Sequence, residues 1–410
     1  MRRLFLLPLA LILVNPGCSD PPAKPVTTGD FGQRTPAYFD SLTPIIDVGV
    51  DGQTGFQFIV DTGSPVTWLN SASFGHAQDY SASGTADLQA FNLSFSAIPT
   101  VTYGAFPADG CGDFPIDGFV GGDLLQFYAL TVDYLGSALF LWDSLDGSPD
   151  IGQDVAPATT VKFHLRGGGH ATVLGVSVDL PRTRILVDGM LEGVPSTFLV
   201  DTGASQVLIP QRVFDTLADQ DRPRIADIPV QTAYGDDTAS IIRLRSLSLG
   251  DVAQTDVPAF VTPDPTFTDS ISAETGTTVV ALVGGSFLRS YQTTIRYSAE
   301  RLDLATYNNP VHVNPLEYVS PGFEIGTSCD GGIFVAQVFP GTSAAEQGIQ
   351  AGFELLTIDT QPLDGLTIDE AGRLMHSYEV GSTVDMQLRG GWAVTTYTFT
   401  YSDLLPRFAQ

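Results

Sequence analysis

The stretch Phe58-Ile59-Val60-Asp61-Thr62-Gly63-Ser64 returns 140 residues later as Phe198-Leu199-Val200-Asp201-Thr202-Gly203-Ala204. Each copy is a short apolar run that ends in an Asp-Thr-Gly turn and is followed by a second apolar segment. An apolar run of this length, bounded by turn residues, predicts a buried strand. A single Asp-Thr-Gly is usually only a turn. Two copies in matching contexts predict two carboxylates that meet.

A second repeated block indicates a duplication of the whole unit. Phe119-Val120-Gly121-Gly122 has its counterpart in Leu282-Val283-Gly284-Gly285, at an offset of 163 residues instead of 140. The second copy therefore carries 23 extra residues between its Asp turn and its Gly-Gly block (163 minus 140). Each Asp-bearing run is also preceded by a strand-like run and a glycine-containing turn, which predicts a hairpin feeding the acidic turn.

Two carboxylates that are close enough to share a proton cannot both ionise cheaply, so one stays protonated while the other is charged. Such a pair supplies a general base that activates water and a general acid that protonates the departing amine. We therefore identify Asp61 and Asp201 as candidate catalytic residues. The candidate supports of the two loops are Thr62, Gly63, Ser64, Thr202, Gly203 and Ala204, with Gly121, Gly122, Gly284 and Gly285 behind them.

These motifs resemble those of the aspartic peptidases, and each half, roughly 43–145 and 183–306, resembles a retropepsin-like lobe. The shared proton is a known property of that family. The resemblance implies a mainly β fold with two pseudo-symmetric retropepsin-like β-barrel lobes, the bilobal aspartic peptidase fold. It also implies a hairpin flap over the substrate, for which Tyr234 and Gly235 are candidates, while 82–103 in the first copy has no clear flap. Pro65 departs from the small polar residue usual in the family.

The C-terminal segment has a different pattern from both copies. The runs Pro340-Gly341-Thr342-Ser343-Ala344-Ala345 and Gly348-Ile349-Gln350-Ala351-Gly352 resemble those of a bacterial PDZ domain, with α+β structure. Phe353 stands where that family usually has Asp. In such domains an extended peptide adds a strand to the sheet edge and a loop takes its carboxylate. By this analogy the loop is Gly322, Phe323, Glu324 and Ile325; a structural cap without a ligand is the alternative.

Composition and the N-terminus bear on localisation. A net charge of −27 repels phosphate backbones and argues against nucleic-acid binding. Arg2 and Arg3 precede the apolar run 4–14, which is typical of a signal peptide and too short for a membrane span. Cys18 resembles the lipidation site of a bacterial lipoprotein; ordinary secretion is the alternative. We thus expect a protein exported to the periplasm or cell surface and held to the membrane only through a lipid anchor.

The sequence predicts an aspartic endopeptidase that acts on polypeptides, with no cofactor and no metal, and with a peptide ligand for its PDZ-like module. A non-catalytic peptide-binding or scaffold lipoprotein is the main alternative. A monomer with an intramolecular site is expected. The alternative is an enzyme in which each lobe pairs with the same lobe of another chain. The expected segments are a signal peptide (1–18), a tether (19–36), the first lobe (37–145), the second lobe (159–307) and the PDZ-like domain (316–404). Within the second lobe, residues 160–179 are expected to form an extra hairpin.

Overall fold

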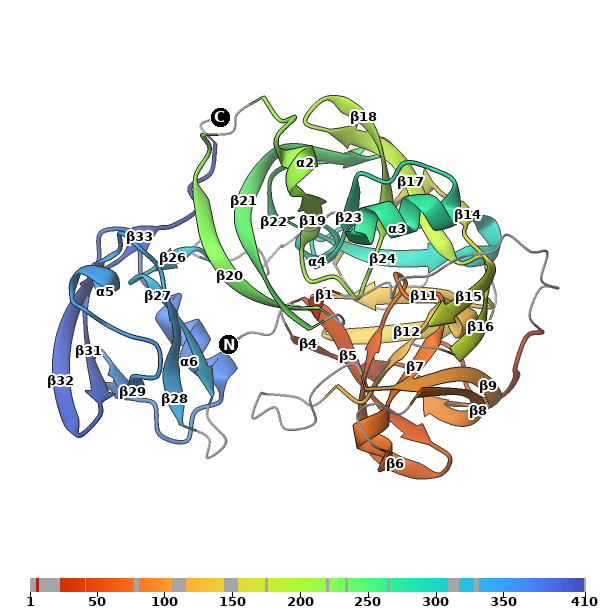
Figure 1. Cartoon of the computed structure of the whole chain (residues 1–410), viewed down its shortest axis with the longest axis horizontal. Helices are drawn as coiled ribbons and strands as arrows, with labels where there is room; N and C mark the ends of the chain where they lie inside the picture. Colours follow the sequence, from red (N-terminus) through yellow and green to blue (C-terminus); the bar gives the residue numbers. More distant parts are fainter. Residues whose placement is uncertain are drawn as a thin grey trace.

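The structure is a computed structural model and is mainly β, as Figure 1 shows. It describes residues 5–6, 23–40, 42–76, 81–104, 116–143, 154–173, 176–218, 221–232, 235–263, 266–308, 317–327 and 332–408. Two β-rich lobes carry the two copies of the repeat, and a smaller module follows them (Figure 1).

The first lobe is one sheet with the strand order β2-β9-β7-β10-β6-β5-β4, in which β8 pairs with β5 and β9. Its Asp-bearing strand β6 pairs in parallel with β10, the strand that leads into the Gly-Gly block. The bounds are β2 (Val26–Gly29), β4 (Tyr38–Asp40), β5 (Thr43–Val50), β6 (Gln53–Val60), β7 (Thr67–Asn70), η1 (Ser71–Phe74), β8 (Ser81–Ala90), β9 (Leu93–Tyr103), β10 (Gly118–Val120) and α1 (Gly122–Leu125).

The second lobe repeats this arrangement in the sheet β1-β20-β21-β22-β19-β23-β18-β17-β14. Its Asp-bearing strand β18 pairs in parallel with β23, with Val200 opposite Val283 as Val60 is opposite Val120. The bounds are β1 (Phe5–Leu6), β14 (His164–Arg166), β17 (Arg184–Leu191), β18 (Val194–Val200), β19 (Val207–Pro210), α2 (Gln211–Phe214), β20 (Arg224–Thr232), β21 (Gly235–Leu249), β22 (Val252–Thr262), α3 (Thr266–Thr275), β23 (Ala281–Val283) and α4 (Gly285–Leu288).

The apolar runs before the two aspartates are buried on both faces. In β6, Phe58 and Val60 point into a core that both lobes share, whereas Ile59 lies in a separate cluster on the opposite face. In β18, Leu199 likewise points away from the shared core. Because successive side chains of a strand alternate between faces, a strand covered on both sides needs an uninterrupted apolar run. This explains why these two runs do not alternate with polar residues.

A further sheet joins the lobes. It has the order β13-β25-β24-β11-β12-β3, so strands from both copies contribute to it. At its centre β11 pairs antiparallel with β24, and Thr131 faces Thr294, which is its own equivalent at the offset of 163. The bounds are β3 (Thr35–Pro36), β11 (Ala129–Asp133), β12 (Ala138–Trp142), β13 (Thr159–Lys162), β24 (Tyr291–Arg296), η2 (Tyr297–Ala299) and β25 (Arg301–Thr306). The pseudo-twofold axis therefore passes through this shared sheet.

The segment 160–179 does not form a single hairpin, contrary to the expectation. β13 joins the shared sheet and β14 pairs with β17 in the second lobe. Only β15 (Gly169–Val173) and β16 (Val176–Leu180) pair with each other. Phe163, between β13 and β14, is buried against Tyr297. Alternation of apolar and polar residues indicates strands but does not identify the strands with which they pair.

The C-terminal module is a small α+β unit with the sheet β27-β28-β29-β31-β32. Its helices begin at N-cap threonines, Thr342 and Thr367, and the second helix has a capping box. The bounds are β26 (Val319–Ser320), β27 (Phe323–Thr327), β28 (Ile333–Val338), α5 (Ser343–Glu346), β29 (Glu354–Ile358), β30 (Gln361–Pro362), α6 (Ile368–Met375), β31 (Thr383–Gly390), β32 (Ala393–Thr400) and β33 (Ser402–Asp403).

The tail after β33 attaches this module to the second lobe. Arg243 of β21 donates from Nε to the Leu405 carbonyl (2.7 Å) and stacks over the ring of Tyr318. Leu405 is fully buried in a cluster of the second lobe. Gln337 of β28 also donates to the Asp227 carbonyl of β20 (2.7 Å). The module thus contacts the strands β20 and β21, which form the hairpin that contains the expected flap.

The N-terminal expectations fall largely outside the described residues, Cys18 included. Phe5 and Leu6 are described, and they pair in parallel with Gln231 and Thr232 of β20. None of the helices in the described ranges has the length and apolar character needed to cross a membrane.

Candidate active site

Asp61 and Asp201 come together where β6 and β18 end. Both are buried, with 0% and 1% of their surface exposed. Each is held from behind by the same backbone hydrogen bond: the Asp61 amide donates to the Val120 carbonyl and the Asp201 amide to the Val283 carbonyl, both at 3.0 Å. The duplicated strand pairs therefore deliver the two side chains to equivalent positions.

Each carboxylate is oriented by the turn that follows it. Asp61 Oδ1 accepts from the amides of Gly63 (2.7 Å) and Ser64 (3.0 Å). Asp201 Oδ1 accepts from the amides two and three residues on, in Gly203 (2.9 Å) and Ala204 (3.2 Å). Hydrogen bonds to one oxygen fix the carboxyl plane and leave the other oxygen, Oδ2, for the centre of the site.

Thr62 and Thr202 bind the two loops to each other. Thr62 Oγ1 donates to the Val200 carbonyl (3.1 Å) and accepts from the Thr202 amide (3.1 Å). The reciprocal bonds run from Thr202 Oγ1 to the Val60 carbonyl (2.7 Å) and from the Thr62 amide to Thr202 Oγ1 (3.0 Å). Because all four bonds are buried and cross the pseudo-twofold axis, the two aspartates cannot move independently.

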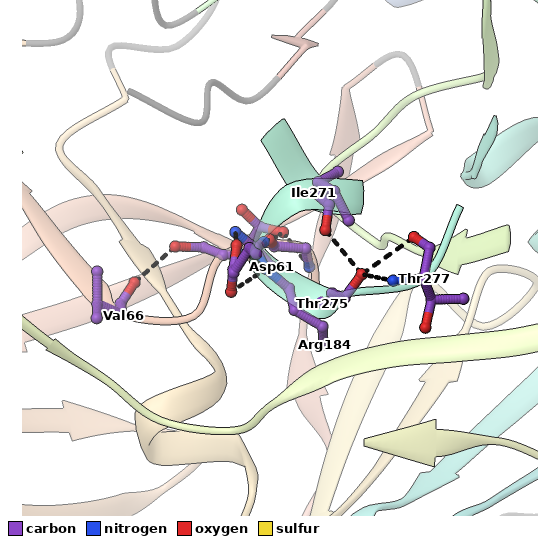
Figure 2. Close-up of polar contacts among 9 residues, drawn as sticks. Asp61, Val66, Arg184, Ile271, Thr275 and Thr277 are labelled. Atoms are coloured by element: carbon purple, nitrogen blue, oxygen red, sulfur yellow. Dashed lines mark hydrogen bonds and ion pairs between the residues drawn. The ribbon is translucent and has the colours of Figure 1, made fainter. Parts of the chain in front are cut away.

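Gly63 is required by the close approach of the opposite aspartate. A Cβ at this position would lie 2.3 Å from Cγ of Asp201, so any side chain would displace the carboxyl group. Ser64 adds a bond within its own loop, from Oγ to the Val66 carbonyl (2.7 Å). Figure 2 shows this bond beside Asp61.

The Gly-Gly blocks lie behind the loops. The Gly122 amide donates to the Ser64 carbonyl and the Gly285 amide to the Ala204 carbonyl, both at 2.8 Å. A Cβ on Gly121 would lie 2.2 Å from the Val66 carbonyl oxygen, and one on Gly284 would lie 2.2 Å from that of Ala204. Glycine at these positions lets α1 and α4 pack directly on the backbone of the Asp loops.

The residue after each Gly-Gly block also supports the loops, which sequence reasoning missed. Asp123 accepts from the amide (2.9 Å) and hydroxyl (2.7 Å) of Thr67. At the offset of 163, Ser286 Oγ accepts from the Val207 amide (2.8 Å). Burial raises the pKa of Asp123 to about 6, although its hydrogen bonds with Thr67 oppose the shift. The repeat offset was the signal that could have identified this pair.

The two aspartates have unequal electrostatic environments. Burial, followed by the charge of Asp201, raises the pKa of Asp61 well above its usual value. Burial also raises the pKa of Asp201, but the hydrogen bond with Asp61, the Gly203 amide and the positive charge of Arg184 hold it down. On losing the first proton, the pair therefore keeps the second on Asp61 and leaves Asp201 ionised.

The two carboxyl groups are placed so that they can share one proton. The two carboxyl groups lie within hydrogen-bonding reach of each other. Asp61 Oδ2 is buried and has no other partner in the part of the chain that the structure describes. Two ionised carboxylates offer only acceptors, so one proton between them satisfies this oxygen. This is the protonation state that general acid–base chemistry requires.

The expected flap lies in the second lobe. β20 and β21 form a long hairpin in which Thr232 faces Gly235 across its tip, while Tyr234 lies outside the described residues. In the first lobe, β8 pairs only with β5 and β9 within the described ranges.

The first amide of the expected carboxylate loop in the C-terminal module is already occupied. Pro321 has no N–H, and the Gly322 amide donates to Ser320 Oγ (3.0 Å). The side chains of Phe323 and Ile325 are buried in the module's core, and Glu324 is half-buried. The strand β27 that carries Phe323, Glu324 and Ile325 is one of the two outer strands of its sheet in the described part of the module, and it lies beside α6.

A hollow of about 710 Å³ lies elsewhere, between β8 and β9 of the first lobe and the hairpin β15–β16. Asp123 and Val66 reach its wall, but neither Asp61 nor Asp201 does. Among the described residues, no three His, Cys, Asp or Glu side chains are grouped so that they could hold a metal ion.

Comparisons with known proteins place one part of this chain. Residues 187–290, which include Asp201 and the β20–β21 hairpin, match the family model described as "gag-polyprotein putative aspartyl protease". Among solved structures, a retropepsin-like aspartic protease from Rickettsia conorii is similar, with 18% identity and a TM-score of 0.25, over 36% of this chain and 99% of that chain. No curated protein matches the sequence.

Proposed function

We propose that the protein is an aspartic endopeptidase whose site lies between Asp61 and Asp201 of one chain. The observation that carries the proposal is the buried carboxyl pair, held by equivalent loops that hydrogen-bond to each other through Thr62 and Thr202. The family match to residues 187–290 supports the same reading for the second half of the site. The pairing of β11 with β24 within one chain favours an intramolecular site over a site made by two chains.

The chemistry follows from the protonation of the pair. Asp201, ionised, takes a proton from a water held between the carboxyl groups, and the oxygen of that water attacks the peptide carbonyl. Asp61 donates its proton to the carbonyl oxygen, which forms a tetrahedral diol. The proton taken by Asp201 then passes to the departing amine as the C–N bond breaks. As the diol collapses to the carboxylic acid product, Asp61 takes back a proton from one of its hydroxyl groups. The cycle therefore ends with one proton on the pair, as it began.

The test uses the full chain without its first 18 residues and an unfolded polypeptide as substrate. We expect cleavage at mildly acidic pH with a bell-shaped pH dependence, since one proton must stay on the pair. Asp61→Asn and Asp201→Asn should each reduce kcat by about 10²–10⁴-fold or more, whereas the exposed Asp47→Asn should not. A kcat equal to that of the wild type in either catalytic variant would refute the shared site. Binding of a statine-containing peptide without cleavage by the wild type would favour a non-catalytic peptide binder.

The C-terminal module, we infer, is a PDZ-like peptide-binding unit that accepts an extended strand along β27. Strand addition needs only the backbone of an outer strand, whereas carboxylate capture needs several free N–H groups, and the Gly322 amide already donates to Ser320 Oγ. An internal polypeptide segment is therefore a better ligand than a free C-terminus. Amidating the C-terminus of a bound peptide should leave its affinity unchanged; a loss of tenfold or more would contradict this reading.

We also propose that Cys18 carries the lipid that holds the protein to a membrane of the cell envelope. The basis is the sequence pattern around Cys18 alone. A Cys18→Ser variant should be recovered in the soluble fraction after export, and the wild type in the membrane fraction. Recovery of the wild type in the soluble fraction would favour ordinary secretion.

A further inference from the structure

A buried ion pair in the second lobe reaches the catalytic loop of the first. Arg184, the first residue of β17, and Glu274, near the end of α3, have side chains that are completely inaccessible to solvent. Arg184 Nε lies 3.1 Å from both Glu274 oxygens, and its Nη2 donates to Oε2 at 2.8 Å. The fork of the guanidinium thus holds the carboxylate with both arms.

The remaining nitrogen of Arg184 contacts the other lobe. Its Nη1 donates to the carbonyl of Gly63. The amide of the same residue, Gly63, donates to Asp61, and its Cα faces the carboxyl group of Asp201. Figure 2 shows Arg184 beside Asp61 and the helix α3. The charge therefore acts on a loop residue that lies between the two aspartates.

The surrounding chain is shaped to admit this pair. Gly167 has φ +83°, and a Cβ there would lie 2.5 Å from Glu274 Oε1 and 3.1 Å from Cγ of Arg184. Thr183, the residue before Arg184, packs against Gly122 of the first lobe. A Cβ on Gly122 would lie 2.5 Å from the Thr183 hydroxyl. Glu274 comes from α3, in the longer stretch that separates the Asp turn from the Gly-Gly block in the second copy.

At the equivalent position the first lobe carries no charge. Ile45 pairs with Ile59 as Leu186 pairs with Leu199, so Thr43 occupies the place of Arg184. Thr43 is buried and neutral, and its hydroxyl has no hydrogen-bond partner among the described residues. The two halves of the site are therefore chemically unequal at this position: one loop is held by a cation and its equivalent is not. The lower pKa of Asp201, to which Arg184 contributes, agrees with this asymmetry.

On the basis of the proposed peptidase function, we propose that Arg184, held by Glu274, is a positioning residue that fixes the Gly63 loop and assigns the two aspartates different roles. Its cation stabilises negative charge on Asp201, which becomes the base, and Asp61 keeps the proton. Arg184 itself is buried behind the loop and touches no substrate.

The test is the acid limb of the pH–kcat profile, because that limb reports ionisation of the base. Arg184→Met should move the acid limb to higher pH. Each shift of about half a pH unit lowers kcat at a given pH on that limb by about threefold. KM should change by less than twofold. Glu274→Gln removes the opposing anion and should move the acid limb to lower pH. Arg184→Lys keeps the charge and should restore the position of the limb. Shifts in the same direction for Arg184→Met and Glu274→Gln, or no shift for Arg184→Met, would overturn the proposal.

A folding control is needed because each single variant leaves a buried charge unpaired. The double variant Arg184→Met/Glu274→Met removes both charges and fills the space with apolar atoms. It should fold, and its acid limb should lie above that of the wild type. A double variant that folds with a wild-type profile would refute a positioning role.

The effect of Arg184 on the ionisation of the two aspartates can also be measured without an activity assay. Carboxyl resonances of ¹³C-aspartate-labelled protein, assigned with Asp61→Asn and Asp201→Asn, follow the two titrations directly. A wild type that neither cleaves nor binds a statine-containing peptide would end the peptidase proposal. The influence of Arg184 on Asp201 would still be decided by whether Arg184→Met raises the titration midpoint of that carboxyl group.

Discussion

The crossed threonine bonds allow a quantitative test of how the two loops are held. Thr62→Ala removes the donor to the Val200 carbonyl and the acceptor of the Thr202 amide. Both partner groups are buried, and an unsatisfied buried group costs about 1–3 kcal/mol. The lost methyl group adds about 0.8 kcal/mol. We therefore expect Thr62→Ala to destabilise the lobes by about 3–7 kcal/mol.

Thr62→Ser is the matched control, since serine keeps the hydroxyl and loses only the methyl group, at a cost of about 1 kcal/mol. Urea unfolding followed by tryptophan fluorescence would measure the difference. Of the three tryptophans, Trp68 and Trp142 lie in the lobes and Trp392 in the C-terminal module, so a Trp392→Phe background isolates the lobes. Equal free energies of unfolding for the alanine and serine variants would show that the crossed bonds do not stabilise the fold.

The other predictions address the glycine, the buried acid and the module. Gly63→Ala should reduce cleavage by about 100-fold or more while the fold is retained, because its Cβ would displace the opposite carboxyl group. Asp123, with a folded pKa of about 6 against an ordinary value of 3.8, contributes stability that is present below pH 4 and lost as the pH rises through 6. Between pH 4 and 7 the stability of the wild type relative to Asp123→Asn should fall by up to about 3 kcal/mol. Arg243→Met should speed proteolytic release of the module, since the bond to Leu405 is lost.

Each of these has a control within the chain. Gly84→Ala adds a Cβ with nothing within 4 Å and should leave cleavage unchanged. Arg389→Met removes an exposed pair with Glu354 inside the module and should not affect its release. Equal activities of the Gly63 and Gly84 variants, a pH-independent difference for Asp123→Asn, or equal release rates for the two arginine variants would contradict the respective arguments.

The sequence repeat predicted the elements around the two aspartates because each of them is a run of consecutive residues. The Asp-Thr-Gly turns and the Gly-Gly blocks recur as contiguous motifs, and the offsets of 140 and 163 located the longer second copy. The extra length is used largely for α3 and the long β20–β21 hairpin.

What the sequence did not predict depends on contacts between distant segments. The pairing of β11 with β24 links residues that are 161 to 167 positions apart, and nothing in the alternation of either strand identifies its neighbour. Arg184 stands at the start of an apolar strand and Glu274 in a polar helix, and only the fold brings them together. An arginine at the edge of a strand that is otherwise buried was the one available signal, because such a charge needs a partner.

The shared sheet has a consequence for how the halves recognise each other. Thr131 meets Thr294 with their hydroxyls 2.9 Å apart, so a position and its own duplicate form one contact, as in an isologous dimer. A polypeptide severed between β12 and β13 should therefore reassemble from its two pieces without assistance. The covalent link between the halves determines which half pairs with which. The geometry of the contact is determined by the sequence of each half.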